Sequence, residues 1–368
     1  MALVKTKALV QKPPREGAMF RNQLLAMTVA FATALAVPVW LAPGAPAGTS
    51  GMTDAGATSG TAAVSDSSPM SGSGSGAAMD WKTMDEQMAK RDKSFPAATK
   101  GEGGKDLAPT VLADGTKEFH LTAAPTKWEI EPGKTVDAWA FNGTVPGPTI
   151  HVNVGDKVKV VVDNKLPEST SVHWHGMQVP NNMDGVSDVT QDPIPPGKSF
   201  TYTWDATRPM VTWYHSHHDG TKQVTSGLYG AIEVGDIPTP DNIKPNQVVL
   251  MQLQDAGTIG MTINGKSFPA TKPIDAHLGD WVEITYINVG TMEHPMHLHG
   301  VDQLVIAKDG FPLPAPYKAD TVPVSPGERY TVLVHADAKG TWAFHCHIFP
   351  HSEGAQGMFG LFTEMRIS

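Results

Sequence analysis

The sequence has a single cysteine among 368 residues, which excludes an intramolecular disulfide framework. Any export signal must therefore be argued without support from disulfides. The chain also lacks an excess of basic residues. Its formal net charge at pH 7 is -9, which argues against nucleic acid and anionic membrane surfaces as partners. Long apolar runs with a helical period are few, and 30 prolines and 36 glycines favour many short strands joined by turns, an all-β fold.

The one cysteine, Cys346, lies between His345 and His347, with His351 and Met358 further along the chain. On a strand, alternate side chains point to opposite faces, so the two flanking histidines point one way and Cys346 the other. One short segment could then serve two metal sites. A thiolate with histidines and a thioether is the ligand set of a blue copper centre, because soft sulfur suits Cu(I) and imidazole suits both oxidation states. A cysteine that is simply buried in a strand is the alternative.

The N-terminal segment, residues 1–47, is predicted to be a signal peptide or an N-terminal anchor. Residues 1–23 carry five basic residues and one acid, and an apolar run follows from Leu24 to Ala42. The small residues Ala45-Pro46-Ala47 are suited to cleavage. Because the apolar run is about long enough to cross a bilayer, an uncleaved membrane anchor is the competing interpretation. Either way, we expect the bulk of the chain to be exported: secreted, periplasmic or at the cell surface.

Residues 48–106 are predicted to be a linker rich in Gly, Ser and Met that contains one short helix. From Gly48 to about Ala78 there is almost nothing to bury, which predicts a flexible tether. Asp80 can cap a helix that places Trp81, Met84 and Met88 on one face. We expect this face to pack on the body of the protein. A methionine site for loading copper is the alternative.

From about Lys117 the chain consists of short β-rich runs bounded by turn residues, for example 118–122, 149–154 and 158–162. Two of the later runs each contain a His-x-His pair. On a strand both imidazoles of such a pair lie on one face, which is the geometry that a metal needs. These pairs are His173 and His175, and His215 and His217.

A second unit follows a proline-rich linker at residues 235–245 and repeats the same rhythm. We place the first domain at residues 107–240 and the second at 241–368. Two turn motifs recur, since Asn142-Gly143 parallels Asn264-Gly265 and Gly155-Asp156 parallels Gly279-Asp280. This weak internal repeat predicts two copies of one Greek-key β-sandwich.

Ten of the fifteen histidines fall in four clusters, HWHG, HSH, HPMHLHG and HCHIFPH. With these motifs the chain, from about Leu107 to Ser368, resembles the multicopper oxidases, and more closely their two-domain, laccase-like members. The resemblance implies two cupredoxin-like domains and four coppers per chain. By motif position, the type 1 copper would be bound by His294, Cys346 and His351, with Met358 as the axial ligand, and the type 2 copper by His173 and His297. The type 3 pair would be held by His175, His215, His217, His299, His345 and His347.

The implied activity is one-electron oxidation of a phenolic, aromatic or metal-ion donor at the type 1 copper, coupled to four-electron reduction of dioxygen to water at the trinuclear cluster. Cys346 and its flanking histidines would provide a covalent route between the two sites. Acids should supply protons near the cluster. Asp184 resembles in position an acid that the family uses, and Glu353 is a second candidate; a solvated loop carboxylate is the alternative for each.

Three departures from the family pattern matter. Many members place the axial residue five positions after the last histidine, which here is Gln356. Two extra residues intervene, and Met358 within Gly-Met-Phe-Gly-Leu-Phe fits the motif better. Because a third domain is missing, the cluster should form between the first domain of one subunit and the second domain of its neighbour, most simply in a homotrimer. The N-terminal region has no twin arginine, so the export route is left open.

Two other functions compete with this reading. A copper nitrite reductase would be expected to carry its type 1 cysteine in the first domain, where Ser216 follows His215 instead. A cuprous oxidase or copper-tolerance protein is suggested by methionines, including Met292 and Met296 beside His294, and by those in the linker: Met52, Met70, Met79, Met84 and Met88. The sequence does not identify the physiological electron donor.

Overall fold

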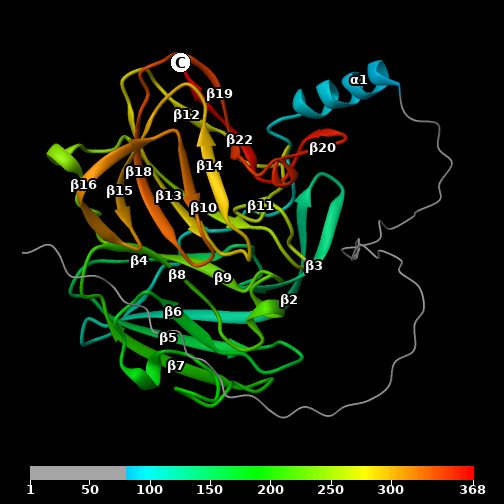
Figure 1. The fold of residues 1–368 in the computed structure, drawn as a ribbon. Helices are drawn as coiled ribbons and strands as arrows, with labels where there is room; N and C mark the ends of the chain where they lie inside the picture. The colour runs from blue at the N-terminus through cyan, green and yellow to red at the C-terminus, as the bar shows by residue number, and fades with distance from the viewer. Residues whose placement is uncertain (1–79) are drawn as a thin grey trace, which may run out of the picture. The chain divides into compact units, whose positions relative to one another are not determined.

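The computed structural model describes residues 80–368, which belong to one compact unit. The predicted signal or anchor segment and the tether up to residue 79 lie outside the described residues. The described residues form two β-sandwiches, one built from strands β1 to β9 and the other from β10 to β22 (Figure 1). Among them, no helix has the length and apolar character needed to cross a membrane.

The first sandwich packs a sheet of order β1-β2-β5-β7, with β3 paired to β2, against a sheet of order β4-β9-β8-β6. Two short helices, η1 (Asn181–Met183) and α2 (Gly220–Gln223), lie in its loops. Its strands are β1 (Thr110–Val111), β2 (Lys117–Glu131), β3 (Lys134–Phe141), β4 (Gly147–Val152), β5 (Lys157–Asn164), β6 (Val172–His175), β7 (Ser199–Asp205), β8 (Met210–Ser216) and β9 (Tyr229–Val234).

The second sandwich packs a sheet of order β11-β10-β13-β18-β15-β16 against a sheet of order β12-β22-β19-β14-β17. A separate hairpin, β20-β21, follows the short helix η3 (Phe349–His351), and η2 (Pro240–Asn242) lies between the sandwiches in sequence. The strands are β10 (Gln247–Gln254), β11 (Thr262–Ile263), β12 (Ile274–Ala276), β13 (Trp281–Asn288), β14 (His294–Leu298), β15 (Gln303–Lys308), β16 (Phe311–Ala319), β17 (Thr321–Val324), β18 (Arg329–His335), β19 (Gly340–Cys346), β20 (Glu353–Gly354), β21 (Gly357–Met358) and β22 (Phe362–Ile367).

The strand pairing repeats from one sandwich to the other. In one sheet of the first sandwich, β2 pairs β5 in parallel and β5 pairs β7 antiparallel. In the corresponding sheet of the second sandwich, β10, β13 and β18 are related in the same way. In the second sheets, β4-β9-β8-β6 and β12-β22-β19-β14 both begin with a parallel pair and continue antiparallel. This equivalence confirms the prediction of two copies of one β-sandwich.

The recurring Asn-Gly turns have the same structure in both copies. Asn142 and Asn264 have φ of 52° and 51°, and the glycines that follow have φ of 76° and 72°. Two successive left-handed residues favour Asn-Gly, because asparagine tolerates this region and glycine has no Cβ to clash. In each turn the asparagine side chain accepts a hydrogen bond from a backbone N–H, of Thr122 or of Gln252. The motif therefore has a structural role.

Three apolar cores hold the molecule together. One lies within each sandwich, around Trp174 and Tyr202 in the first and around Tyr286 and Phe344 in the second. The third draws residues from both sandwiches, among them Trp213 of the first. This shared core explains why the two sandwiches form one compact unit, because burial of apolar surface between them is favourable.

One predicted strand was too short. We expected residues 118–122, whereas β2 extends from Lys117 to Glu131. Its first half pairs with β5 and its second half with β3, so that two neighbours use one strand in succession. The short β-rich run was visible in the sequence, but the continuation through Pro125 was not, since proline is usual only at strand edges and bulges.

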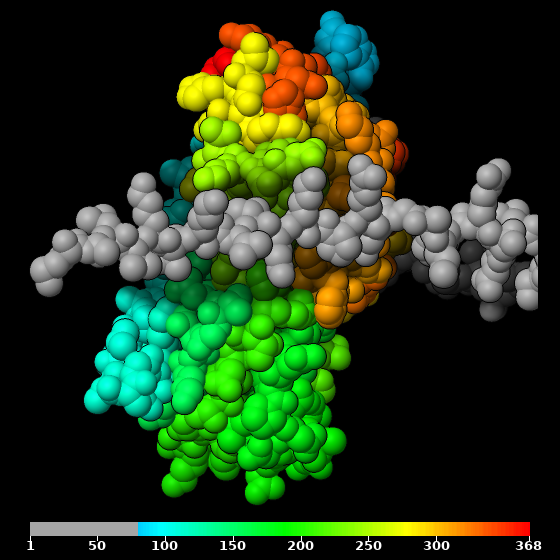
Figure 2. All heavy atoms as spheres, turned by 90° about the vertical axis from the view of Figure 1, so that its left-hand side faces the viewer, coloured from blue at the N-terminus to red at the C-terminus, as the bar shows by residue number. Residues whose placement is uncertain are grey.

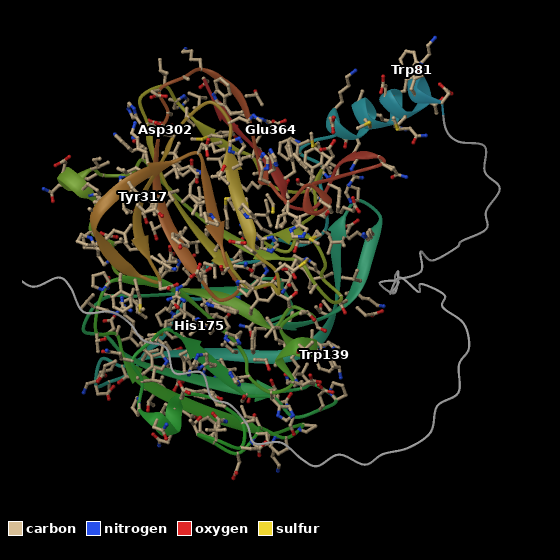
Figure 3. All side chains as sticks on the ribbon, in the orientation of Figure 1. Trp81, Trp139, His175, Asp302, Tyr317 and Glu364 are labelled. Atoms are coloured by element: carbon tan, nitrogen blue, oxygen red, sulfur yellow. The ribbon has the colours of Figure 1, made fainter. Side chains whose placement is uncertain are left out.

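The short helix was predicted correctly. α1 covers Trp81–Asp92, and the Asp80 carboxylate accepts hydrogen bonds from the N–H groups of Lys82 and Thr83, at 3.0 and 3.2 Å. The expectation that its apolar face packs on the body holds only at Met88, which contacts the β20-β21 hairpin through Gly357. Trp81 is 65% exposed and lies at the outer end of the helix, pointing away from the sandwiches (Figure 3).

Candidate metal centres

The structure brings His294, Cys346 and His351 together in one buried group. His294 begins β14, Cys346 ends β19, and His351 ends the short helix η3. The Cys346 Sγ atom lies 3.7 Å from His294 Nδ1 and 3.5 Å from His351 Nδ1, and the two Nδ1 atoms are 3.2 Å apart. Cys346 and His294 are fully buried and His351 is 4% exposed. One thiol and two imidazoles thus converge on a single point, which is what a blue copper site requires.

A metal bound at this point would have to displace the proton of the Cys346 thiol but none from His351. Burial raises the pKa of the Cys346 thiol to about 11, so without a metal the sulfur keeps its proton at neutral pH. Burial also lowers the pKa of His351, which keeps its imidazole neutral and able to act as a ligand. A metal that binds here deprotonates the thiol, because a coordinated thiolate is far more stable than a free one in this apolar surrounding. The donor set therefore fits copper.

Asp255 is a buried partner of His294 that the sequence did not reveal. Its buried carboxylate accepts hydrogen bonds from the backbone N–H of Thr291 and of Met292 and lies 3.0 Å from His294 Nε2. Burial raises the pKa of this carboxyl, but the bonds from His294, Thr291 and Met292 outweigh burial and lower it to about 2. The carboxylate thus holds Nε2–H of His294 and directs its Nδ1 toward Cys346. No sequence signal links two residues 39 positions apart.

The axial candidates lie on the β20-β21 hairpin. Glu353 pairs with Met358 and Gly354 with Gly357, which leaves Gln356 in the two-residue turn between the strands. The tip of the hairpin thus consists of Ala355 and Gln356. Gln356 is exposed there, whereas Met358 is half-buried at the base. This geometry favours Met358 over Gln356.

Four histidines of the first sandwich form one open group. His173 on β6 lies directly opposite His215 on β8 in the antiparallel ladder. The ring centroid of His173 is 5.6, 5.3 and 5.5 Å from those of His175, His215 and His217. The pairs are therefore on one face, as the period of two predicts.

The second sandwich repeats this arrangement. His297 on β14 lies directly opposite His345 on β19. Its ring centroid is 4.7, 5.9 and 5.3 Å from those of His299, His345 and His347. His345 and His347 stack at 5.7 Å, on the opposite side of β19 from Cys346. One strand thus serves both a buried group and an open one.

Backbone carbonyls fix which ring nitrogens remain free. Nδ1 of His173 lies 2.8 Å from the Asp184 carbonyl, and Nδ1 of His297 lies 3.0 Å from that of Asp320. His215 and His345 each place Nδ1 beside the carbonyl of the next residue, at 2.8 and 3.0 Å. If Nδ1 donates to a carbonyl, Nε2 of all four rings is left unprotonated and available as a metal ligand.

Several of these imidazoles are held in the neutral form. Burial, followed by the positive charge of Arg329, lowers the pKa of His175 to about 3. Burial also lowers the pKa values of His215, His299 and His345. Neutral imidazole is the form that binds metals, so these rings need not lose a proton first.

The glycines that follow two of the His pairs have a steric role. Gly176 and Gly300 have φ of 73° and 76°, where residues with a Cβ are strained. A Cβ at Gly176 would lie 2.6 Å from the Arg329 guanidinium, and one at Gly300 would lie 2.3 Å from the Trp342 ring. The final G of HWHG and HPMHLHG thus lets the Arg329 and Trp342 side chains pack against the turns that follow these histidines.

The first sandwich has no counterpart of the buried thiol–imidazole group of the second. Ser216 occupies the position on β8 that Cys346 occupies on β19, and the Oε1 atom of buried Gln223 accepts hydrogen bonds from Ser216 and from Thr170, at 2.6 and 2.8 Å. Gln223 Nε2 donates to Glu168 and to the Ser169 carbonyl. A closed hydrogen-bond network fills the space that a type 1 copper would need.

The two candidate acids lie in different places. Asp184 Oδ1 is 3.4 Å from His173 Nδ1, at the edge of the first open group. Glu353 is exposed on β20, beside Met358. Among residues 80–368, no hydrogen bond or ion pair connects its carboxylate to a histidine. The structure thus brings Asp184, but not Glu353, to the histidines.

The two open groups do not meet within one chain. Among the described residues, no hydrogen bond or ring contact joins a histidine of the first group to one of the second. The close nitrogen contacts, His175–His215 at 3.4 Å and His299–His345 at 3.2 Å, stay within each group. His217, His299 and His347 are exposed. His175 lies where the two sandwiches meet (Figure 3).

Comparisons with known proteins agree with this geometry. Family models described as multicopper oxidase match residues 122–238 and 242–367. Laccase-2 of Botryotinia fuckeliana is 32% identical over 285 residues, which cover 66% of this chain and 48% of that protein. The chain thus spans about half the length of this curated relative.

Two solved structures are also similar. The blue copper oxidase of Nitrosomonas europaea has a TM-score of 0.65 and 35% identity, with 68% of this chain and 85% of that chain covered. The multicopper oxidase mgLAC has a TM-score of 0.64 and 37% identity, with 68% and 86% covered. The chain belongs to the multicopper oxidase family, whose members bind type 1, type 2 and type 3 copper, four per chain.

Proposed function

We propose that this protein is a laccase-like oxidase that takes single electrons from a small reducing substrate and reduces dioxygen to water with four of them. The observation that carries the proposal is strand β19. Its Cys346 side chain lies in the buried thiol–imidazole group, whereas His345 on the strand and His347 just after it lie in the open histidine group. A donor site and an acceptor site are thus one peptide unit apart along the chain, on either side of Cys346.

The proposed ligands follow from the geometry and the family. His294, Cys346 and His351 would hold the type 1 copper, with Met358 as axial ligand. His173 and His297 would hold the type 2 copper. When bound, copper supplies the one-electron redox chemistry at the first site and dioxygen binding at the second. The type 3 pair would be held by His175, His215, His217, His299, His345 and His347.

The chain's own groups orient these ligands and handle protons. Asp255 fixes the His294 ring, and the Asp184 carbonyl fixes the His173 ring. The Asp184 carboxylate, beside His173, is the proposed proton donor to the cluster, because it is close to a ligand and partly open to solvent. Glu353 is the second candidate and would act from the hairpin near the type 1 site.

We further propose that the trinuclear cluster forms between subunits, in a homotrimer. Two open histidine groups, each lacking half of the ligands, support this. Because a head-to-tail contact closes into a ring, three copies give three complete clusters. Light scattering should report three times the mass of one chain. An active, fully metallated monomer would refute the proposal.

A cuprous oxidase is the second candidate function. Met84 and Met292 are 37% and 42% exposed, and soft thioethers bind Cu(I). A nitrite reductase is disfavoured, because Ser216 and Gln223 close off the position where the first domain would need its type 1 copper. Export of the protein remains a proposal that rests on the sequence of residues 1–47.

Oxygen uptake by the copper-loaded protein tests the proposed function. We expect four electrons from donor to be used per dioxygen, with no hydrogen peroxide released, for a panel of phenols, aromatic amines, Cu(I) and Mn(II). A strong preference for Cu(I) that is lost on deleting residues 48–90 would favour the cuprous oxidase. Nitrite reduction without oxygen uptake would refute both.

A further inference from the structure

The helix α1 is hydrogen-bonded to the second sandwich by the side chain of Arg91. Its Nε donates to the Met358 carbonyl at 2.6 Å, and its Nη2 donates to the Phe268 carbonyl at 2.6 Å and to Glu131 Oε2 at 2.8 Å. The guanidinium thus ties together the N-terminal helix, the end of β2, a loop of the second sandwich and strand β21. Arginine suits this role because its planar group offers several donors in fixed directions.

Strand β21 needs such support. It is two residues long and pairs only with β20, and a short two-stranded hairpin is barely stable on its own. The rest of the hairpin, residues 353–356, is exposed. Figure 1 shows α1 beside this hairpin, and Figure 2 shows the blue helix projecting from the surface next to the orange and red C-terminal strands. The Met358 carbonyl therefore has its anchor outside the sandwich.

Further contacts hold α1 and its C-terminal extension against the same region. Met88 lies against Gly357, where an added Cβ would be 3.2 Å from the methionine side chain. The Phe95 ring stacks on Phe268 at 5.0 Å, and Ala97 N–H donates to the Pro269 carbonyl. The chain on both sides of Arg91 is therefore held against the second sandwich, by Met88 before it and by Phe95 and Ala97 after it.

We infer that Arg91 is a positioning residue for the type 1 site, which holds the backbone of Met358, the proposed axial ligand. The inference rests on the proposed function, specifically on Met358 as axial ligand. An axial thioether donates electrons to the oxidised copper, so a looser Met358 favours the reduced form and raises the reduction potential. The N-terminal helix then becomes part of the device that sets this potential.

Arg91→Ala and Arg91→Lys in the full-length, copper-loaded protein test the inference. The lysine variant keeps the charge opposite Glu131 but lacks the planar fork, so it guards against a simple folding defect. Lys90→Ala, one residue away and exposed, is the matched control. Glu131→Gln removes the ion pair and leaves both carbonyl contacts.

Two readouts are needed. Amide hydrogen exchange across residues 353–361 should become about tenfold faster in both Arg91 variants, because a charge-assisted hydrogen bond to this segment is lost. The type 1 reduction potential should rise, with the blue absorption band retained because Cys346 is untouched. Lys90→Ala should leave both readouts unchanged, and Glu131→Gln should have the smaller effect. Unchanged exchange or an unchanged potential in both Arg91 variants would overturn the inference.

Met358→Leu separates the inference from the function on which it rests. If this variant raises the potential and the Arg91 variants do not, the positioning role is wrong and the axial assignment stands. If Met358→Leu leaves the potential unchanged, the axial assignment fails and the inference fails with it. Oxygen uptake in the wild type is scored independently of both outcomes.

Discussion

Asp255→Asn should damage the type 1 site while changing almost no volume. The carboxylate of Asp255 meets four donors: the N–H and hydroxyl of Thr291, the N–H of Met292 and Nε2 of His294. An amide has one acceptor oxygen and two N–H donors. Whichever way it is turned, an NH2 group faces at least one donor that the carboxylate satisfied.

The magnitude follows from these contacts. The N–H groups of Thr291 and Met292 and Nε2 of His294 all meet Oδ2, so an amide whose NH2 group takes that position loses the contact with His294, and a hydrogen bond to a charged group contributes about 1.5–3 kcal/mol. At 1.4 kcal/mol for each factor of ten, this corresponds to about 10- to 100-fold weaker copper binding at the type 1 site, the range seen when the partner of a metal-bound histidine is removed. The metal-free protein should lose about 2 kcal/mol of unfolding free energy, because the bonds to Thr291 also weaken.

The assay is a copper titration that follows the blue absorption band, with urea unfolding of the metal-free protein alongside. Asp302→Asn is the control, since its ion pair with Lys318 is 72% and 60% exposed on the two side chains and should contribute little. If Asp255→Asn binds type 1 copper as tightly as the wild type does, Asp255 does not orient His294 and this part of the reasoning is wrong.

Three further predictions concern other parts of the molecule. Burial, with repulsion from Glu233 and Asp236, raises the pKa of Glu283 to about 7 from 4.5, so the native chain keeps a proton that the unfolded chain releases as the pH rises between these values. Relative to Glu283→Gln, the wild type should therefore lose about 3 kcal/mol of unfolding free energy from pH 4.5 to 7, measured by urea denaturation, and parallel curves would contradict this. Met358→Leu should raise the type 1 potential, measured by redox titration, and keep the blue colour; an unchanged potential would count against the axial role. Gly176→Ala should lower the unfolding free energy by about 1 kcal/mol or more, because its Cβ would lie 2.6 Å from the Arg329 guanidinium. A variant as stable as wild type in thermal unfolding would show that Arg329 and this turn can move apart at little cost.

The fold and the open histidine groups were predictable because their signals are local. A His-x-His pair on a strand places both rings on one face whatever the rest of the chain does, and the Asn-Gly turns mark equivalent hairpins in both sandwiches. His173 opposite His215 and His297 opposite His345 follow once these strands pair.

The contacts that support the metal groups were not predictable in this way. Asp255 meets His294 across 39 positions, and Arg91 meets Met358 across 267. Neither residue lies in a motif, and a lone acid or arginine is usually a surface residue. The core shared by the sandwiches, with Trp213 among its members, also depends on how two domains dock, which periodicity does not encode.

Mixing two inactive variants tests the central claim, that one subunit's first sandwich and its neighbour's second sandwich together reduce dioxygen. His217→Ala disables one open group and His347→Ala the other, and both side chains are exposed in the single chain, so folding should be unaffected. Each variant alone should consume no oxygen. In co-expressed trimers, random assembly leaves about one site in four with both groups intact, so oxygen uptake should recover to about a quarter of wild type. Mixed trimers, verified by native mass spectrometry, that remain inactive would contradict the account.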